Sequence, residues 1–286
     1  MTRAQPRSYL FVPATSGAKI DKACLSAADA VIVDLEDAVA LGEKAAAREA
    51  LAQRLQEGLP RPVWVRVNAT DTDFCLADLQ ACCRPGVAGL LLPKVETGEA
   101  LRMVDWVLGN LERERGRPAR GIPVAGIVET AAGLQNVGAV AAASPRLQRL
   151  MFGAVDLAAD LGIDLADDAA TAPARFAVAC PSRAAGLAPP VDTAYTDIPN
   201  LEGLRATALR AKALGYTAKA CIHPAQIETV HAVFTPTAQE LAWARAVVEA
   251  FEQAERDGLA AVTLQGQMLD YPVVEKARRV LASGGG

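Results

Sequence analysis

The sequence predicts an α/β protein whose fold is a (βα)8 TIM barrel with a C-terminal helical extension. Eight short apolar runs alternate with longer segments rich in alanine and leucine, as expected for strands and helices around a parallel sheet. The chain has 286 residues, enough for a barrel of roughly 250. Polar residues follow nearly every run, as expected at the carboxyl ends of barrel strands. We therefore assign residues 1–235 to a barrel catalytic domain and 236–286 to the extension.

The eight apolar runs have the length and composition of buried parallel strands. The seventh run carries the weakest signal. In chain order they are Tyr9–Val12, Ala30–Val33, Val63–Val67, Gly89–Leu92, Val124–Val128, Arg149–Phe152, Pro190–Thr193 and Ala218–Ile222.

The segments between the runs have apolar residues at spacings of three and four, which predicts helices. The pattern is clear in Glu43–Gln56, Gly98–Glu114, Ala131–Ala143 and Leu201–Leu214. Before the seventh run, we expect Pro181 to break or kink the helix, because proline lacks a backbone donor and crowds the preceding turn.

The extension is longer than barrel closure requires. Thr235-Pro236-Thr237 begins a helix, and Gly258 follows its polar end. An apolar stretch over Ala260–Leu264, a glycine and a final helix to about Leu281 complete the chain. Asp270 stands two residues before a proline, a position that suits a helix N-cap. A structural role for Asp270 therefore remains open beside a catalytic one.

The amino-acid composition limits the classes of protein to which this chain can belong. With 51% hydrophobic and 22% charged residues, the chain can bury a sizeable core, and a net charge of −4 argues against a nucleic-acid surface. No apolar run approaches the roughly 20 residues of a membrane span, and Met1–Arg7 has no apolar signal core behind it. We expect a cytoplasmic enzyme without nucleic-acid or membrane partners.

The cysteines are expected to be reduced packing residues. The six of them show no paired Cys-x-x-Cys spacing. A nucleophilic thiol needs an activating partner, and the chain has only His223 and His231 to supply one. Cysteine chemistry is therefore not favoured.

Glu129 and Asp156 form the strongest candidate for a metal site. Each closes a short apolar run, Pro123–Val128 and Leu150–Val155 respectively. Carboxylates at consecutive strand ends suit Mg²⁺, which binds one or two carboxylates, keeps several waters and accepts substrate oxygens. Acids after strands also serve as helix caps, so the pair alone leaves capping and metal binding open.

Arg66 is the candidate for binding negative charge on a substrate. Its planar guanidinium matches a carboxylate or enolate oxygen and stays cationic at any working pH. The alternation of Trp64-Val65-Arg66-Val67 places Arg66 on the same strand face as Trp64, either in the lumen or on the helix side. An exposed surface charge is the alternative.

Glu36 and Asp37 follow the second run and have two possible roles. They accept hydrogen bonds from waters on the metal, or they neutralise basic neighbours such as Lys44 or Arg48. Both interpretations remain open from the residues alone.

Ordered blocks along the chain resemble the citrate lyase β-subunit-like (CitE-like) branch of the HpcH/HpaI aldolase/citrate lyase superfamily. The similarity covers nearly the whole chain. The blocks are Arg7–Pro13, Asp34–Val39 with Lys44 and Arg48, Val65–Asn68, Leu92–Val95, Ile127–Thr130 with Gly133-Leu134, Phe152–Asp156, Ile222–Gln226 and Gly266–Asp270.

The resemblance implies Mg²⁺ as the cofactor, with Glu129 and Asp156 as its ligands. It implies that Arg66 binds the substrate and that Glu36 and Asp37 lie around the metal waters. It further implies that Asp270 is an acid/base delivered into the site of a neighbouring subunit. A homotrimer or a dimer of trimers would be the closed symmetric assembly for such a head-to-tail exchange.

The reaction implied is reversible cleavage of a 3-hydroxyacyl thioester of the malyl-, citramalyl- or citryl-CoA type into an acetyl-type thioester and an α-keto acid. The thioester carrier is coenzyme A or an acyl-carrier arm. One departure concerns that carrier. Pro13-Ala14-Thr15-Ser16 stands where the family usually has Pro-Gly and a polar or basic residue.

Two other functions are compatible with part of this residue set. Metal-dependent pyruvate-type aldolases, which act on an aldehyde without a thioester, resemble this chain but use a histidine after the second strand, and Asp34–Val39 contains none. A catalytically silent subunit that binds an acyl thioester is the third reading. The complete set of acids, arginine and metal ligands argues against silence.

Overall fold

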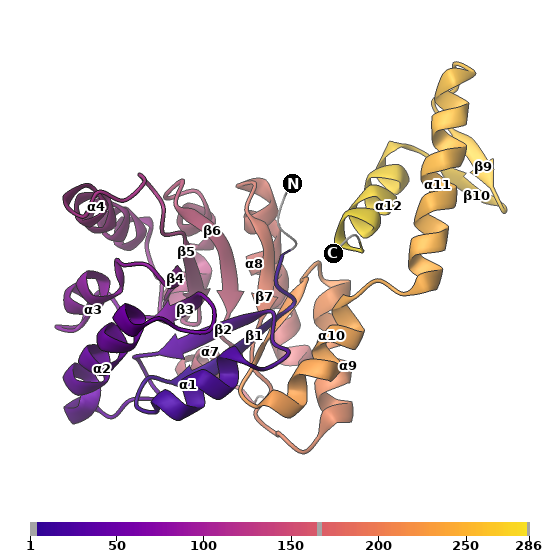
Figure 1. Ribbon diagram of the computed structural model, residues 1–286. Coiled ribbons are helices and arrows are strands. Elements are labelled where there is room, and N and C mark those ends of the chain that lie inside the picture. The colour runs from indigo at the N-terminus through magenta and orange to yellow at the C-terminus, as the bar shows by residue number, and fades with distance from the viewer. Residues whose placement is uncertain (1–4, 165–167, 285–286) are drawn as a thin grey trace. The chain divides into compact units, whose positions relative to one another are not determined.

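The computed structural model describes residues 5–164 and 168–284, and it contains a closed barrel of eight parallel strands (Figure 1). The predicted fold class is confirmed. β1 closes the barrel by pairing with β8, with Tyr9 beside Ala220. The strands are β1 (Ser8–Pro13), β2 (Ala30–Asp34), β3 (Val63–Arg66), β4 (Val87–Leu92), β5 (Val124–Val128), β6 (Leu147–Phe152), β7 (Ala188–Asp192) and β8 (Ala218–Cys221).

Helices follow the strands and surround the sheet, as Figure 1 shows. The helices described up to Phe234 are α1 (Gly17–Cys24), η1 (Leu41–Glu43), α2 (Lys44–Glu57), α3 (Cys75–Cys82), α4 (Gly98–Glu114), α5 (Ala131–Gln135), α6 (Val137–Ala141), α7 (Ala154–Leu161), α8 (Asp168–Ala184), α9 (Leu201–Ala213), η2 (Pro224–Gln226) and α10 (Ile227–Phe234).

Two sequence expectations about helices were wrong in detail. The single helix expected over Ala131–Ala143 is divided into α5 and α6 at Asn136. Of the break or kink expected at Pro181, the break does not occur, because α8 runs through that residue to Ala184, and the kink stays a prediction. A proline removes only one backbone donor from a helix. The packing of α8 against β6 and β7 stabilises this helix more than the low helix propensity of proline destabilises it.

The lumen of the barrel is filled by apolar side chains from alternate strand positions. Trp64 packs against this cluster, and so Arg66, two residues later on β3, projects from the same side of the sheet. Gly89 makes room for the indole, because a Cβ at position 89 would lie 2.5 Å from the Trp64 ring. The cluster consists of Tyr9, Ala30, Ile32, Leu91, Ala125, Ile127, Met151, Val191, Ala218 and Ala220.

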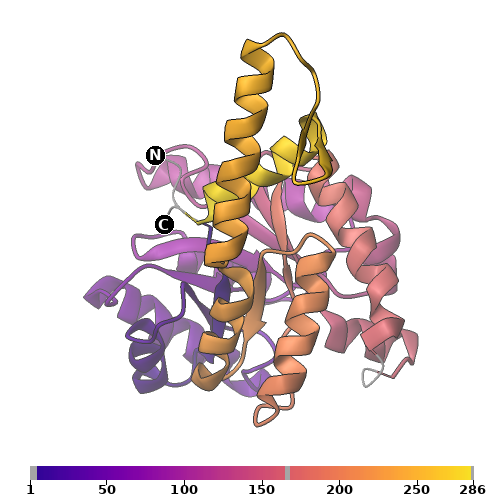
Figure 2. The ribbon, with the colours of Figure 1, turned by 90° about the vertical axis from the view of Figure 1, so that its right-hand side faces the viewer.

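The chain divides into a barrel unit, Arg7–His231, and a smaller unit formed mainly by residues 232–284. The smaller unit contains α11 (Ala238–Arg256), the antiparallel strands β9 (Val262–Leu264) and β10 (Gln267–Leu269), and α12 (Tyr271–Ser283) (Figure 2). It has an apolar core of its own, which consists of Ala244, Val247, Phe251, Leu269, Val274 and Ala277.

Local signals explain the elements of the smaller unit. Thr237 and Glu240 form a reciprocal capping box at the start of α11, where Thr237 Oγ1 accepts the Glu240 amide at 3.1 Å. Gln265 and Gly266 join β9 to β10 with φ angles of 50° and 80°, as a tight hairpin turn requires. Within the described ranges, no helix is both long enough and apolar enough to cross a membrane.

Candidate active site

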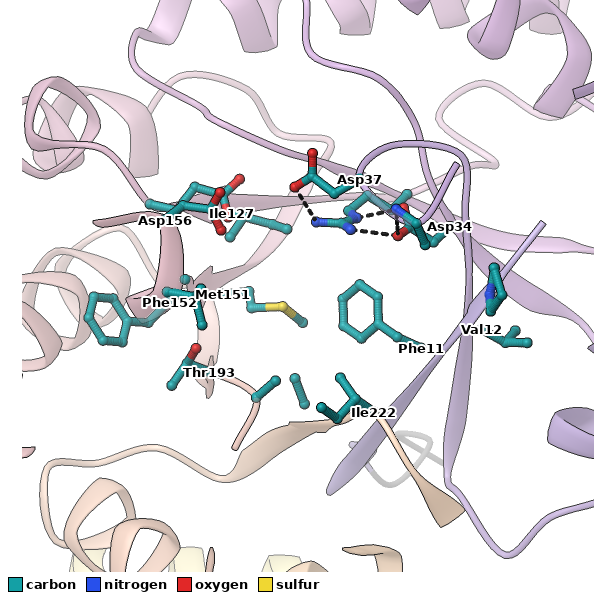
Figure 3. A pocket seen from close by; sticks show the side chains of 18 residues that line it. Phe11, Val12, Asp34, Asp37, Ile127, Met151, Phe152, Asp156, Thr193 and Ile222 are labelled. Carbon is teal, nitrogen blue, oxygen red and sulfur yellow. Dashed lines mark hydrogen bonds and ion pairs between the residues drawn. The ribbon is translucent and has the colours of Figure 1, made fainter. Parts of the chain in front are cut away.

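A pocket of about 420 Å³ opens among the carboxyl ends of the barrel strands. Figure 3 shows Asp156 and Asp34 at opposite sides of it, with Phe11 and Met151 lying below them in that view. The pocket combines an apolar part, to which Phe11, Ile127, Met151 and Ile222 contribute, with a polar part made by Asp34, Asp37, Arg66, Glu129, Asp156 and Thr193.

Arg66 lies at the end of β3, where strand register pairs it with Asp34 on β2. Its Nε donates to Asp34 Oδ1 at 2.7 Å, and its Nη2 donates to Oδ2 at 2.5 Å. The Phe11 ring lies beneath the guanidinium, with 5.2 Å between the ring centroid and Cζ. Burial opposes the charge, but hydrogen bonds and attraction to Asp34 and Glu36 outweigh it and raise the pKa of Arg66. The guanidinium is therefore cationic and held in one orientation.

The loop after β2 folds back on Asp34. Asp34 Oδ1 also accepts the backbone amide of Glu36 at 2.9 Å. Lys44 donates from Nζ to the backbone carbonyl of Glu36 at 2.9 Å. Arg48 pairs with Asp78, with 3.2 Å between Nη1 and Oδ1. Lys44 and Arg48 thus have other partners, so neither is the basic neighbour that Glu36 and Asp37 neutralise.

Glu36 and Asp37 pair instead with Arg66 and Lys94. Glu36 Oε2 lies 2.8 Å from Arg66 Nη1, and its other oxygen contacts Lys94 Nζ. The carboxylate of Asp37 lies farther from both cations, with 3.8 Å between its Oδ2 and Arg66 Nη1 and 3.7 Å between its Oδ1 and Lys94 Nζ. Burial raises the pKa of Glu36 against the opposing effect of the two cations. Contact of Glu36 and Asp37 with metal waters stays a prediction.

Glu129 follows β5 directly and is 2% exposed. Its Oε1 accepts the backbone amide of Lys94 at 2.8 Å. Gly153 leaves space for it, because a Cβ at that position would lie 2.5 Å from Glu129 Cβ and 2.6 Å from Oε2. Burial, followed by repulsion from Asp156 and Glu36, raises the pKa of Glu129 to about 8. A cation at this carboxylate would offset that repulsion.

Asp156 lies in the first turn of α7, where the helix dipole favours a negative charge. Thr193 Oγ1 accepts the amide of Ala154 at 3.0 Å and so holds the start of this helix against β7. Neither carboxylate is a cap, since Thr130 caps α5 and Gly153 occupies the cap position of α7. The capping interpretation of the pair is therefore wrong.

The donor set fits a hard cation with few protein ligands. Glu129 and Asp156 line the same pocket, and the described part of the chain contains no cluster of three or more His, Cys, Asp or Glu side chains suited to a metal. Mg²⁺ accepts such a site because waters and substrate oxygens complete its octahedron. The assignment of these two ligands stays a prediction.

Asp270 belongs to the smaller unit, where it caps α12. Its Oδ1 accepts the amide of Val273 at 3.2 Å. The cap interpretation is confirmed, and its catalytic role stays a prediction.

Five cysteines are buried and Cys180 is exposed. Burial raises the pKa of Cys75 and of Cys221 to about 12, which makes thiolate chemistry there unfavourable.

From the sequence, Asp34 and Lys94 were expected only as polar residues just past the second and fourth runs, and Gly153 only as a member of a motif, without a specific role for any of them. The position of Lys94 just past the fourth run was the available signal, since polar residues there face a barrel mouth. Nothing in the pattern indicated that its amide would contact Glu129.

A closed barrel with charged groups at its mouth has the architecture of a TIM-barrel enzyme. Residues 7–224 match the family described as HpcH/HpaI aldolase/citrate lyase, and the chain belongs to this family. The predicted class, a carbon–carbon lyase of this family, is confirmed.

Two relatives and one solved structure illustrate the similarity. The chain is 35% identical over 284 residues to the citrate lyase subunit beta of Haemophilus influenzae, covering 96% of this chain and 95% of the relative. It is 36% identical over 279 residues to the (3S)-malyl-CoA thioesterase of Cereibacter sphaeroides, covering 96% and 93%. CitE from Mycobacterium tuberculosis, in complex with magnesium, acetoacetate and coenzyme A, is 32% identical, with a TM-score of 0.80 and 100% of both chains covered.

Proposed function

We propose that this protein is an Mg²⁺-dependent lyase that cleaves or forms a 3-hydroxyacyl thioester, of the malyl-, citramalyl- or citryl-CoA type. The products of cleavage are an acetyl-type thioester and an α-keto acid. The observation that carries the proposal is the buried Glu129 carboxylate, which is repelled by Asp156 in a pocket that also contains Arg66. The magnesium-bound CitE relative supports the choice of metal.

Glu129 and Asp156 are the residues that would hold Mg²⁺. When bound, the ion supplies a Lewis acid for the carboxylate and carbonyl oxygens of the keto acid. Charge matching supports this role, because two close carboxylates without a cation repel each other.

Arg66 would bind the oxygen on which negative charge develops when the carbon–carbon bond breaks. Asp34 occupies two of the five N–H donors of the guanidinium, and Glu36 lies beside a third nitrogen. The remaining donors are available to a substrate carboxylate or enolate oxygen. A fixed cation in a largely apolar pocket stabilises such charge without reorganisation during the reaction.

The apolar part of the pocket has a separate task. Phe11, Ile127, Met151 and Ile222 offer surface to the carbon skeleton of the acyl group and exclude water from the reacting carbons. The coenzyme A in the CitE relative supports coenzyme A as the carrier, with an acyl-carrier arm as the alternative.

Asp270 is the proposed acid/base that exchanges a proton with the α-carbon of the acetyl thioester. We place it in the site of a neighbouring subunit, because the smaller unit has its own core and exceeds what barrel closure needs. A head-to-tail exchange of this kind closes symmetrically in a homotrimer or in a dimer of trimers.

A second reaction deserves a direct comparison, because a 36% identical relative is a (3S)-malyl-CoA thioesterase. The deciding experiment incubates malyl-, citramalyl-, methylmalyl- and citryl-CoA with the protein, with and without Mg²⁺. A lyase releases an α-keto acid and an acyl-CoA in equal amounts, whereas a thioesterase releases free coenzyme A without keto acid. An aldolase instead condenses pyruvate with an aldehyde. Absence of every product from all four thioesters would contradict the proposed function and favour a silent binding subunit.

A further inference from the structure

Lys94 contacts both charged halves of the candidate site, although it is absent from the pocket lining. Its backbone amide donates to Glu129 Oε1 at 2.8 Å. Its ammonium pairs with Glu36, which in turn lies 2.8 Å from Arg66 Nη1. We propose that Lys94 is a positioning residue that holds the carboxylate of Glu129 and the guanidinium of Arg66 in fixed relation to each other. The inference rests on the proposed metal site.

The backbone of Lys94 carries the first half of the argument. Its φ angle is 48°, in the left-handed region, which a residue with a side chain rarely adopts because its Cβ crowds the backbone there. The structure retains this conformation at the end of β4, where it directs the amide at Glu129 and leaves the next amide, that of Val95, to pair with the carbonyl of Ile127 at 3.0 Å. Strain kept at one residue of a binding site indicates that its geometry is needed there.

The side chain carries the second half. Glu36 is a buried carboxylate between two cations, and its Oε2 makes no well-formed hydrogen bond, although Arg66 Nη1 is close. Without the Lys94 ammonium, Arg66 would be the one close cationic partner left to Glu36 among the described residues, and Asp37 would also lose a neighbouring cation. Glu36 and Asp34 bind the Arg66 guanidinium from different sides. The loss of the ammonium would therefore change the relative strength of these two interactions, and with it the orientation of Arg66.

Arg120 offers a matched control at the other end of β5. It also has a positive φ, 55°, and its amide also donates to a carboxylate, Glu112 Oε2, at 2.9 Å. Glu112 is bound by Arg146 in a buried ion pair that does not involve the pocket residues. A residue with a positive φ whose amide donates to a carboxylate thus occurs beside the candidate site, at Lys94, and also away from it, at Arg120.

The test compares Lys94→Gly with Lys94→Ala, and Arg120→Gly with Arg120→Ala. Glycine adopts a positive φ without strain, so Lys94→Gly keeps the amide on Glu129 and loses only the ammonium. Lys94→Ala loses the ammonium and favours a rotated backbone. We measure Mg²⁺ affinity by calorimetry, the melting temperature of the metal-free protein, and kcat and KM for a cleaved thioester.

We expect both Lys94 variants to lose about tenfold or more in kcat, and Lys94→Ala alone to lose about tenfold in Mg²⁺ affinity. The Arg120 variants should differ from each other in melting temperature and leave Mg²⁺ affinity unchanged. Equal Mg²⁺ affinity in wild type, Lys94→Gly and Lys94→Ala would overturn the backbone role. Wild-type kcat in Lys94→Gly would overturn the side-chain role.

These outcomes are separate from failure of the proposed function. A wild-type protein that does not bind Mg²⁺ removes the proposed metal site itself. A wild type that binds Mg²⁺ while the Lys94 variants behave as wild type removes only the present inference. If Lys94→Ala does not fold, Lys94→Gln replaces it, because glutamine is also a neutral side chain that disfavours a positive φ.

Discussion

Asp34 accepts hydrogen bonds from Arg66 through both carboxylate oxygens. Oδ1 lies 2.7 Å from Arg66 Nε, and Oδ2 lies 2.5 Å from Nη2. The two residues are register partners on neighbouring strands, so the sheet itself brings them together. A two-point ion pair of this kind fixes the plane of the guanidinium as well as its position. What Arg66 offers to a substrate therefore depends on its shape and not only on its charge.

Replacing Arg66 by lysine tests that dependence. Lysine keeps the positive charge but cannot meet both oxygens of Asp34 and a substrate oxygen at once. We expect Arg66→Lys to lower kcat/KM by more than about tenfold, which is about 1.4 kcal/mol of transition-state stabilisation. Arg48→Lys, at the Arg48 and Asp78 pair outside the pocket lining, is the matched control and should change kcat/KM little. Near-normal kinetics for Arg66→Lys would assign it a structural role.

The metal assignment is tested with amide substitutions. A neutral amide is a poorer ligand for a hard cation than a carboxylate, so Asp156→Asn and Glu129→Gln should each lose Mg²⁺ binding and activity together. Asp160→Asn is the control, because Asp160 lies on the same helix but binds the amide of Ala131 at 2.7 Å. Calorimetry gives the affinity and circular dichroism the fold. Unchanged Mg²⁺ binding in both ligand variants would exclude the pair.

Mg²⁺ affinity should depend on pH because Glu129 has a pKa of about 8 without metal. Below pH 8 the carboxyl group carries a proton, and the metal must displace it to bind the ionised form. The apparent affinity should therefore fall as pH decreases from about 8, by up to about tenfold per pH unit, and level off above it. Calorimetry in two buffers with different heats of ionisation counts the released proton. A flat affinity from about pH 6 to pH 9 would contradict this expectation.

Asp270 is expected to act in a neighbouring subunit. Asparagine caps helices as well as aspartate does, so Asp270→Asn should keep α12 and lose only the carboxylate. Asp270→Asn and Arg66→Ala should each be inactive alone. Activity should return when the two are mixed and exchange subunits, because some hybrids combine an intact Asp270 with an intact Arg66. Hybrids that form by mass spectrometry but stay inactive would place both residues of a site in one chain.

Most of the fold was predictable because it depends on local patterns. Buried parallel strands are short apolar runs, and each of the eight runs became a strand. The division between α5 and α6 was not predicted, and Asn136, the residue at which it falls, makes a contact that is distant in the sequence. The side chain of Asn136 donates to the backbone carbonyl of Glu96 at 3.0 Å, and no helical periodicity contains that information.

The candidate site was predictable to a smaller extent. Glu129 and Asp156 were found because each ends an apolar run, and chain order places such residues at one end of the barrel. The partners of Glu36 and Asp37 were not found. They depend on how far the side chains of Arg66 and Lys94 reach across neighbouring strands, which is set by register and by one positive φ angle.

The pairing of β1 with β8 also has a consequence for how the chain is made. Tyr9 leaves the ribosome early and meets Ala30 soon afterwards, whereas Ala220 is synthesised only at the end of the barrel. Until then the growing sheet has two open edges, each with unpaired backbone groups that can capture a wrong strand. Contacts between such distant segments also form slowly. A nascent chain that stalls before β8 would therefore be exposed to aggregation, even with every strand that supplies Arg66, Glu129 and Asp156 already complete.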